Sequence, residues 1–251
     1  MPDTPDSHDL SYSRHLALPE FGAEGQAHVV AARMLLVGLG GLGSPAAMYL
    51  AAAGVGTLLL NDFDTVDLSN LQRQLLYRRT DVGHTKVDSA AASIAGINPK
   101  CRVEKLAQRL SETELQALLA NVDVVLDGSD NFGTRFVVNA ACMHTGTPLV
   151  SGAAIRYEGQ LTTLVPRDPA SPCYACLYQE GDEELENCGS NGVFAPLTGV
   201  IGSMMAVEAL KLITGIGDTL TGRLLQYDAR GATIRTTILK RDPACPVCSQ
   251  R

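Results

Sequence analysis

The chain has 251 residues, 45% of them hydrophobic, so it can bury a sizeable core as one large α/β domain or as one domain with an appendage. Its formal net charge of −7 argues against nucleic acid or an acidic membrane surface as a partner. The sequence shows no signal-peptide pattern and no uninterrupted apolar run of about eighteen residues that would span a membrane, so we expect a cytoplasmic protein.

The N-terminal part of the chain carries only weak patterns. Residues 1–9 are polar and predict a loose tail, and short helical fragments follow between Leu10 and Val30, broken at Pro19 and Gly22. Arg14 lies among these fragments. The pattern alone does not distinguish it from a solvated surface residue.

A glycine-rich turn between a strand and a helix is the strongest motif of the chain. The apolar run Met34–Val37 predicts a buried strand, and the Ala-rich pattern over Pro45–Ala53 predicts a helix. Between them lie three glycines at GxGxxG spacing, namely Gly38, Gly40 and Gly43. In such a turn the first glycine permits the tight bend, the second lets backbone approach a phosphate, and the third lets the helix pack closely with its N-terminal amides facing the anion.

A second apolar run extends this unit. Thr57–Leu60 predicts the next strand, and Asp62 follows it about twenty positions after the glycines, where a carboxylate can reach a ribose hydroxyl. The unit therefore predicts a nucleotide-binding site. A tight packing turn without any ligand is the alternative.

The segment that begins at Asp62 is DFDTVDLSNLQRQ. Ser69 and Gln72 have capping-box spacing and predict a short helix that begins near Asn70. On such a helix Asn70 and Arg73 share one face, and their amide and guanidinium groups suit contact with phosphate or ribose. A capped surface helix with a solvated arginine is the alternative.

Thr85 and Asp88 predict the start of a further helix, which Asn98 and Pro99 end. Lys86 occupies its first position, where a cation opposes the helix dipole by a few tenths to about 1 kcal/mol. A phosphate bound at this helix end would reverse the penalty, so Lys86 is a candidate phosphate ligand. A tolerated exposed lysine is the alternative.

The βαβ pattern continues with strands at 101–106 and 122–126 around a helix at 111–119. The second strand ends in DGSDN, at the carboxyl edge where open α/β sheets place their ligands. Asp130 in this turn can hold Mg²⁺ through its carboxylate oxygens, or it can cap a helix that begins near Asn131, and both can hold.

The rest of the chain predicts additions to the sheet and one core helix. A strand at 148–151 leads into SGAAIRYEGQLTTLVP, which predicts one or more antiparallel strands. The apolar stretch Val193–Ile213 carries Glu208 and Lys211 and several small residues, which favours a buried core helix over a membrane span. Residues 222–239 predict a closing hairpin.

Four of the seven cysteines form two CxxC pairs. Cys173 and Cys176 form one pair and Cys245 and Cys248 the other, and together they supply four thiolates for tetrahedral Zn²⁺. Four protein ligands leave no open position for catalysis, so we predict a structural zinc site. Thioredoxin-type redox centres are the alternative.

Between the pairs lies the acidic segment YQEGDEELENCGSNG, which predicts a mobile loop. It carries Cys188, a candidate nucleophile. Acidic neighbours would raise the pKa of this thiol and blunt its reactivity.

The motifs GLGGLG, DxDxVxxSNLxRQ, DGSDN and the paired CxxC, together with the Lys86 helix, resemble the ubiquitin-activating-like adenylyltransferases of the MoeB/ThiF/HesA family. The resemblance runs from about Ser11 to Cys248. It implies a single domain over 1–251 with an α/β fold, in which a Rossmann-like nucleotide-binding sheet has a parallel core and antiparallel C-terminal strands. The nucleotide-binding core covers about 30–152, and the carrier-binding and zinc region covers about 153–251.

The resemblance also implies an activity. The substrate would be a small ubiquitin-like sulfur-carrier protein whose C-terminal Gly-Gly carboxylate attacks the α-phosphorus of ATP, giving an acyl adenylate and pyrophosphate. Asp62 would hold the ribose, Asp130 would place Mg²⁺, and the phosphates would be clamped by Asn70, Arg73 and Lys86. Further nucleotide contacts would come from Gly38, Gly40, Gly41, Gly43, Ser69, Leu71, Gln72 and Asn131.

The family is homodimeric and takes a phosphate-binding arginine from the partner subunit, and Arg14 matches that position. The choice of carrier is less defined. SGAAIRYEGQ resembles the MoeB-type members, which activate MoaD-type carriers for molybdenum cofactor synthesis, and this is the carrier we predict. ENCGSNG is similar to ThiF-type members, which activate ThiS for thiamine synthesis and in which a cysteine at the position of Cys188 can link covalently to the carrier.

Two hypotheses from other classes are weaker. An NAD-dependent oxidoreductase would share the glycine motif and Asp62, but it would leave SNLQRQ and Lys86 unexplained. A scaffold without catalysis would be expected to have lost the phosphate-binding residues, which are all present.

Overall fold

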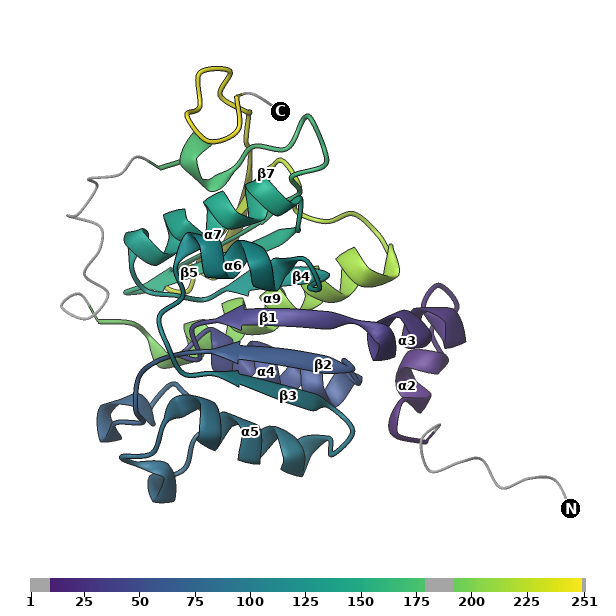
Figure 1. Cartoon of the computed structure of the whole chain (residues 1–251), viewed down its shortest axis with the longest axis vertical. Helices are drawn as coiled ribbons and strands as arrows, with labels where there is room; N and C mark the ends of the chain where they lie inside the picture. Colours follow the sequence, from purple (N-terminus) through teal and green to yellow (C-terminus); the bar gives the residue numbers. More distant parts are fainter. Residues whose placement is uncertain (1–9, 179–191, 250–251) are drawn as a thin grey trace, which may run out of the picture.

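The computed structural model describes residues 10–178 and 192–249 (Figure 1). Within these residues, one eight-stranded sheet has the order β3-β2-β1-β4-β5-β6-β7-β8. The strands are β1 (Arg33–Val37), β2 (Thr57–Asn61), β3 (Arg102–Leu106), β4 (Val124–Asp127), β5 (Leu149–Ile155), β6 (Glu158–Leu164), β7 (Arg223–Asp228) and β8 (Thr233–Ile238). Strands β1 to β5 run parallel and β6 to β8 are antiparallel, which confirms the predicted fold class.

Helices cover both faces of the sheet (Figure 1). They are α2 (Ser13–Leu16), α3 (Gly22–Ala31), α4 (Gly43–Ala53), α5 (Lys86–Ile97), α6 (Glu112–Leu119), α7 (Phe132–Thr145) and α9 (Ala195–Thr214), with short 3₁₀ turns η1 (Leu68–Asn70), η2 (Arg79–Asp81) and η3 (Tyr174–Cys176). The helices predicted from hydrophobic periodicity are therefore present.

The central strands are apolar on both sides because each side meets a layer of helices. On β1, Met34 and Leu36 join the core formed with α3, α4, α5 and α9. Leu35 and Val37 point the other way and join the core formed with α6 and α7. This explains why the sequence of β1 is continuously hydrophobic, as in buried parallel strands, and does not alternate.

The strand order places a crevice next to the glycine turn. Strand β1 pairs with β2 on one side and with β4 on the other, and the chain visits β2 and β3 before it returns to β4. The direction of winding changes between β1 and β4, and open α/β sheets bind ligands beyond the carboxyl ends of the strands at such a point.

Strand β5 crosses the predicted boundary near residue 152, and β6 to β8 continue the same sheet. The division into a nucleotide-binding core and a carrier-binding region stays a prediction.

Helix α9 packs against α4, β5 and β6. Its length and composition alone would suit a membrane span, but 44% of its apolar window is buried inside the fold. The carboxylate of Glu208 is buried in it and accepts hydrogen bonds from Thr163 Oγ1 at 2.6 Å and from the backbone N–H of Leu220 at 2.7 Å. The prediction of a core helix is confirmed, because a buried carboxylate needs such partners within the protein.

Candidate functional site

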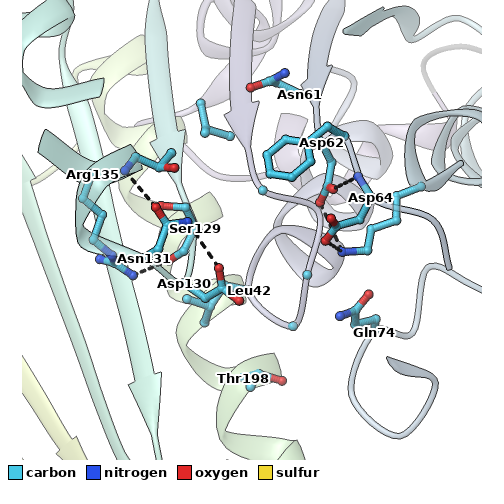
Figure 2. Close-up of a pocket in the computed structure, with 18 of the residues that line it drawn as sticks. Leu42, Asn61, Asp62, Asp64, Gln74, Ser129, Asp130, Asn131, Arg135 and Thr198 are labelled. Atoms are coloured by element: carbon cyan, nitrogen blue, oxygen red, sulfur yellow. Dashed lines mark hydrogen bonds and ion pairs between the residues drawn. The ribbon is translucent and has the colours of Figure 1, made fainter. Parts of the chain in front are cut away.

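A cavity of about 770 Å³ opens at the carboxyl ends of β1, β2 and β4 (Figure 2). It brings together residues that are far apart in the sequence. Its walls include most of the predicted site residues, namely Gly38, Gly40, Gly41, Asp62, Ser69, Gln72, Arg73, Lys86, Asp130 and Asn131. The predicted residues Gly43, Asn70 and Leu71 are not among its lining residues, and neither is Arg14.

The glycine turn has the geometry that its spacing predicts. Gly38 adopts φ +82°, a left-handed conformation that favours glycine. A Cβ on Gly43 would lie 1.9 Å from the carbonyl oxygen of Gly38, so only glycine lets α4 begin this close to the strand. A Cβ on Gly40 would have only Gln74 Nε2 nearby, at 3.7 Å, so the missing side chain leaves backbone accessible from the cavity. At Gly41 a Cβ would press on the Thr198 side chain of α9 at 3.0 Å.

Asp62 connects the end of β2 to the glycine turn. Its Oδ2 accepts the backbone N–H of Leu39 at 2.8 Å, and its Oδ1 accepts the N–H of Asp64 at 2.9 Å. These bonds fix the carboxylate beside the glycine turn (Figure 2). Asp62 therefore supports the turn, and its Oδ1, which accepts one hydrogen bond, keeps a lone pair for a ligand.

Lys86 is buried at the first position of α5, with Thr85 as the predicted N-cap. Its Nζ lies 2.8 Å from Asp64 Oδ2 and 3.5 Å from Asp62 Oδ2. The alternative of an exposed lysine is wrong, because the side chain is only 7% exposed. The two carboxylates compensate the unfavourable position of a cation at a helix N-terminus, and they hold the ammonium group at the cavity wall.

The turn at 67–73 differs from the prediction. Asp67, not Ser69, is the N-cap: its carboxylate accepts the N–H of Ser69, and Asn70 Oδ1 accepts the N–H of Asp67 at 3.1 Å. Two capping-box spacings overlap here, Asp67 with Asn70 and Ser69 with Gln72, and the structure uses the first. The amide of Asn70 thus supports the turn, while Arg73 is partly exposed at the cavity, where its Nη1 donates to the carbonyl of Ser69 at 3.2 Å.

Tyr77 supports the same region from behind. Its hydroxyl donates to the carbonyl of Leu39 at 2.9 Å, which ties the turn to the segment that follows Arg73. Burial raises the pKa of Tyr77, so it stays a neutral hydrogen-bond donor.

The loop after β4 presents Asp130. Asn131, not Asp130, caps α7: its Oδ1 accepts the N–H of Thr134 at 2.9 Å, so the interpretation of Asp130 as the cap is wrong. Asp130 is exposed at the cavity, and Asn131 Nδ2 contacts its Oδ1 at 3.5 Å. A carboxylate that is not used as a cap suits a hard cation such as Mg²⁺.

The cavity is also lined by residues that the motifs did not identify, among them Asp64, Arg109, Arg135 and Thr198. Asp64 could have been identified from the sequence, because it follows Asp62 by two positions in the DFD motif. Arg109 lies over the ring of Phe63 at 4.8 Å, and Arg135 is buried by contacts with distant backbone. Neither arginine carries a motif that would have identified it.

Arg14 is separated from the other site residues within the chain. It lies on α2, which packs against α3 beyond the amino ends of the strands, on the far side of the sheet from the cavity (Figure 1).

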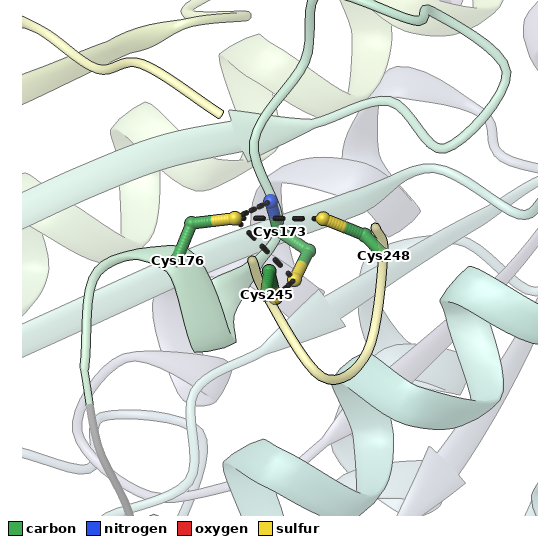
Figure 3. A group of neighbouring side chains, drawn as sticks. All are labelled: Cys173, Cys176, Cys245 and Cys248. Carbon is green, nitrogen blue, oxygen red and sulfur yellow. Dashed lines mark hydrogen bonds between the residues drawn. The ribbon is translucent and has the colours of Figure 1, made fainter. Parts of the chain in front are cut away.

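The four cysteines of the CxxC pairs come together as predicted (Figure 3). Their Sγ atoms all lie within 4.8 Å of one another, with 3.6 Å between Cys173 and Cys245 and 3.5 Å between Cys176 and Cys248. A tetrahedral Zn²⁺ with Zn–S bonds of about 2.3 Å would set its sulfurs about 3.8 Å apart. The donor set and its spacing therefore fit zinc.

The surroundings of the cluster also fit a metal site. Cys176 Sγ accepts backbone N–H groups of Cys173 and Asp242, each at 3.5 Å, which is how proteins stabilise thiolate ligands. Burial raises the pKa of the Cys173 thiol, so a cation is needed to keep four sulfurs ionised in one cluster. Cys188 and its predicted mobile loop lie outside the described residues.

Comparison with known proteins agrees with this geometry. The family model described as the ThiF family matches residues 12–247, so the chain belongs to the ThiF family. The molybdopterin-synthase adenylyltransferase of Escherichia coli is 46% identical over 250 residues, with 100% of both chains covered. The sulfur carrier protein ThiS adenylyltransferase of the same organism is 42% identical over 239 residues, covering 95% of this chain and 94% of the other.

A solved structure shows the same fold. The crystal structure of E. coli MccB with MccA-N7isoASN superposes with a TM-score of 0.82 at 25% sequence identity, covering 95% of this chain and 74% of that one. The resemblance to the MoeB/ThiF/HesA family that the motifs indicated is thus confirmed.

Proposed function

We propose that this protein is an adenylyltransferase that uses ATP to activate the C-terminal carboxylate of a small ubiquitin-like sulfur-carrier protein. The observation that carries the proposal is the convergence of Gly40, Asp62, Arg73, Lys86 and Asp130 on one cavity, in a chain that two named adenylyltransferases cover almost completely. The glycine turn offers backbone amides, and Arg73 and Lys86 offer positive charge, to the same cavity. Both features suit a nucleoside triphosphate.

The chemistry needs positioning more than proton transfer. A C-terminal carboxylate has a pKa of about 3.5 and is already ionised at neutral pH, so it needs no general base. One of its oxygens forms a bond to the α-phosphorus while the bond from that phosphorus to the leaving pyrophosphate breaks. The contribution of the protein is to align the two reactants in line and to stabilise the charge that develops on the phosphates.

The proposed roles follow from where the side chains lie. Arg73 is partly exposed on the cavity wall and can fold onto phosphate oxygens, and Lys86 supplies a fixed charge from a buried position. Asp62 would bind the ribose with its remaining lone pairs. The backbone near Gly40 and Gly41 would contact the nucleotide.

Two metals accompany the proposal. Asp130 would hold Mg²⁺, which supplies charge neutralisation to the triphosphate when bound. The four cysteines Cys173, Cys176, Cys245 and Cys248 would hold Zn²⁺, which fastens two distant turns together and leaves no open position for substrate.

For the carrier, we propose a MoaD-type protein, with a ThiS-type protein as the alternative. The 46% identity with the molybdopterin-synthase enzyme favours the first, and the 42% identity with the ThiS enzyme keeps the second open. We further propose that the protein is cytoplasmic and that it forms a homodimer. The dimer is proposed because Arg14 lies too far from the cavity of its own chain to act there.

Intact-mass measurement of candidate carriers tests the function. The purified protein is incubated with Mg-ATP and either a MoaD-like or a ThiS-like carrier from the same source, and each carrier is weighed. Gain of one adenylyl group on one carrier identifies the substrate. If neither carrier gains mass while ATP binds, the carrier assignment is wrong. Tighter binding of NAD than of ATP would instead favour an oxidoreductase.

The role of Cys188 needs its own experiment. Cys188→Ser is compared with the unmodified protein in transfer of sulfur to the adenylated carrier. Unimpaired transfer excludes a covalent role of this thiol. Loss of transfer with adenylation intact would support the role found in ThiF-type enzymes.

A further inference from the structure

Arg135 is a buried arginine in the wall of the nucleotide cavity. It lies in the first part of α7, and its side chain reaches back to the carboxyl edge of the sheet (Figure 2). Burying a guanidinium is costly unless its donors are satisfied, so the contacts of this side chain indicate what it is there to hold.

Arg135 donates hydrogen bonds to backbone on two separate elements. Its Nη2 donates to the carbonyl of Ser129, in the loop after β4, and to the carbonyl of Gly152 on β5 at 2.9 Å. Gly152 is seventeen positions further along the chain from Arg135. One guanidinium group thus joins the loop that carries Asp130 to the neighbouring strand of the sheet.

The peptide groups next to Asp130 are fixed from several sides. The N–H of Ser129 donates to Asp127 Oδ1 at 2.9 Å, while its carbonyl accepts from Arg135. On the other side, Asn131 is held as the N-cap of α7. Asp130 is the exposed residue between these fixed positions, so its backbone is held from both sides.

We infer that Arg135 is a positioning residue for Asp130: by holding the Ser129 carbonyl against β5, it aims the Asp130 carboxylate into the cavity for a divalent cation. The inference rests on the proposed role of Asp130 as a magnesium ligand. Residues that orient a metal ligand without touching the metal commonly change metal affinity by about 10- to 100-fold when they are replaced.

A contact between Arg135 and an aromatic ring extends this support to the cysteine cluster. Its guanidinium lies 6.0 Å from the centre of the Tyr174 ring, in the η3 turn between Cys173 and Cys176. The backbone N–H of Tyr174 donates to Asn139 Oδ1 at 2.8 Å, which fixes this turn against α7. The first CxxC turn and the Asp130 loop therefore share Arg135 as a common support.

Binding of ATP at varied Mg²⁺ concentration, measured by calorimetry without any carrier, tests the inference. For Arg135→Gln we expect the Mg²⁺ concentration that gives half of the maximal enhancement of ATP binding to rise about 10- to 100-fold. The affinity for ATP without Mg²⁺ should change less than about twofold. Arg135→Lys keeps the charge but has a single donor centre, so its Mg²⁺ response should lie between those of the unmodified protein and Arg135→Gln. The rise should also appear as weaker Mn²⁺ binding to the ATP complex by electron paramagnetic resonance.

Arg33→Gln is the matched control. Arg33 also donates to a backbone carbonyl, that of Asn121 at 2.9 Å, but it lies at the amino end of β1, away from the cavity. This variant should lose thermal stability and keep the Mg²⁺ response of the unmodified protein.

An unchanged Mg²⁺ response in Arg135→Gln, with only a lower melting temperature, would show a merely structural role and overturn the inference. If Arg135→Gln does not fold, the same criterion applies to Arg135→Lys. Because no carrier is present, failure of carrier adenylation would leave this result intact, so the two proposals fail separately.

Discussion

The ammonium group of Lys86 lies 2.8 Å from the carboxylate of Asp64, and the same Asp64 donates its backbone N–H to Asp62. This pair joins the N-terminus of α5 to the end of β2. Since the backbone N–H of Lys86 also donates to the Asp64 carbonyl at 3.0 Å, the position of this cation is fixed by main chain and side chain together. A lysine held in this way keeps its charge at the cavity wall without the entropy loss of ordering a free side chain on binding.

Because Lys86 is held by these contacts, replacing Lys86 and replacing Arg73, the two proposed phosphate ligands, should lower the stability of the protein by different amounts. Arg73→Ala removes a partly exposed side chain with a single hydrogen bond, to the carbonyl of Ser69, so it should leave the melting temperature nearly unchanged. Lys86→Ala leaves the buried Asp62 without its ion-pair partner and should cost about 1–3 kcal/mol of unfolding free energy. Both variants should lose carrier adenylation by about 100-fold or more, because each removes a charge that stabilises the transition state.

Thermal melting and pyrophosphate release measured on the same preparations check this prediction. Arg79→Ala is the control, since Arg79 is an exposed cation on η2 that does not line the cavity. Near-normal turnover in Arg73→Ala or Lys86→Ala would contradict the phosphate assignment. Equal stability of the two variants would contradict the role of Lys86 as an ion-pair partner.

The glycine turn gives a second pair of variants. Gly43→Ala would bring a Cβ to 1.9 Å from the Gly38 carbonyl oxygen, so we expect it to disrupt the start of α4 and lower the yield of folded protein. Gly40→Ala meets only Gln74 Nε2, at 3.7 Å, so it should fold normally. Its new methyl group would instead obstruct the approach of phosphate to the backbone and weaken ATP binding by about tenfold.

Gly96→Ala is the matched control for these substitutions. No atom lies within 4 Å of a Cβ at Gly96, which is inside α5. Replacement there should raise stability by about 0.5–1 kcal/mol, because alanine loses less backbone entropy in a helix, and it should leave ATP affinity unchanged. Unchanged ATP affinity in Gly40→Ala as well would show that the turn packs the sheet without contacting the nucleotide.

The contrast between the glycine turn and Arg135 shows what the sequence could predict. Gly43 acts through its contact with Gly38, five positions earlier in the same turn, so the GxGxxG spacing contained this geometry. Arg135 acts through the carbonyl of Gly152, on a strand whose position depends on the whole sheet. No local pattern could have shown that this arginine would be buried beside the loop of Asp130.

The turn at 67–73 shows a second limit. Asp67 with Asn70 and Ser69 with Gln72 have the same capping-box spacing, so the sequence allowed two helix starts two residues apart. The structure selects the first, and Asn70 thereby turns its amide toward Asp67 while Arg73 lines the cavity. Periodicity located the neighbouring strand and helix, but the spacing alone did not distinguish between the two overlapping caps.

Removal of the zinc proposed for the four-cysteine cluster should destabilise the protein without abolishing nucleotide binding. The cluster joins the turn at 173–176 to the turn at 245–248, while the glycine turn and Lys86 belong to other elements. We expect a chelator to lower the melting temperature by about 5 °C or more. This corresponds to a loss of roughly 1–2.5 kcal/mol of unfolding free energy, at roughly 2–4 °C per kcal/mol in a domain of this size.

Differential scanning calorimetry with bound zinc quantified by mass spectrometry checks this expectation. Cys245→Ser should reproduce the effect of the chelator. Cys101→Ser is the control, because Cys101 is a buried thiol outside the cluster. A metal-free protein with unchanged melting would exclude a structural role of the site.

The position of Arg14 leads to a prediction about subunit exchange. Arg14 lies on α2, on the opposite side of the sheet from the cavity, whereas Arg73 lines the cavity of its own chain. If Arg14 serves the partner's site in a homodimer, Arg14→Ala and Arg73→Ala should each be inactive as pure dimers. A mixed dimer would contain one site with both arginines intact and one site with neither.

Random mixing in equal amounts makes half of the dimers mixed, and half of the sites in these are complete. The mixture should therefore regain about one quarter of the activity of the unmodified protein. Pyrophosphate release after unfolding and refolding the two variants together measures this, and refolding each variant alone provides the baseline. Recovery to about one quarter requires that sites be shared between subunits. Activity of the mixture no higher than the baseline would contradict sharing, and full activity of Arg14→Ala alone would remove Arg14 from the site.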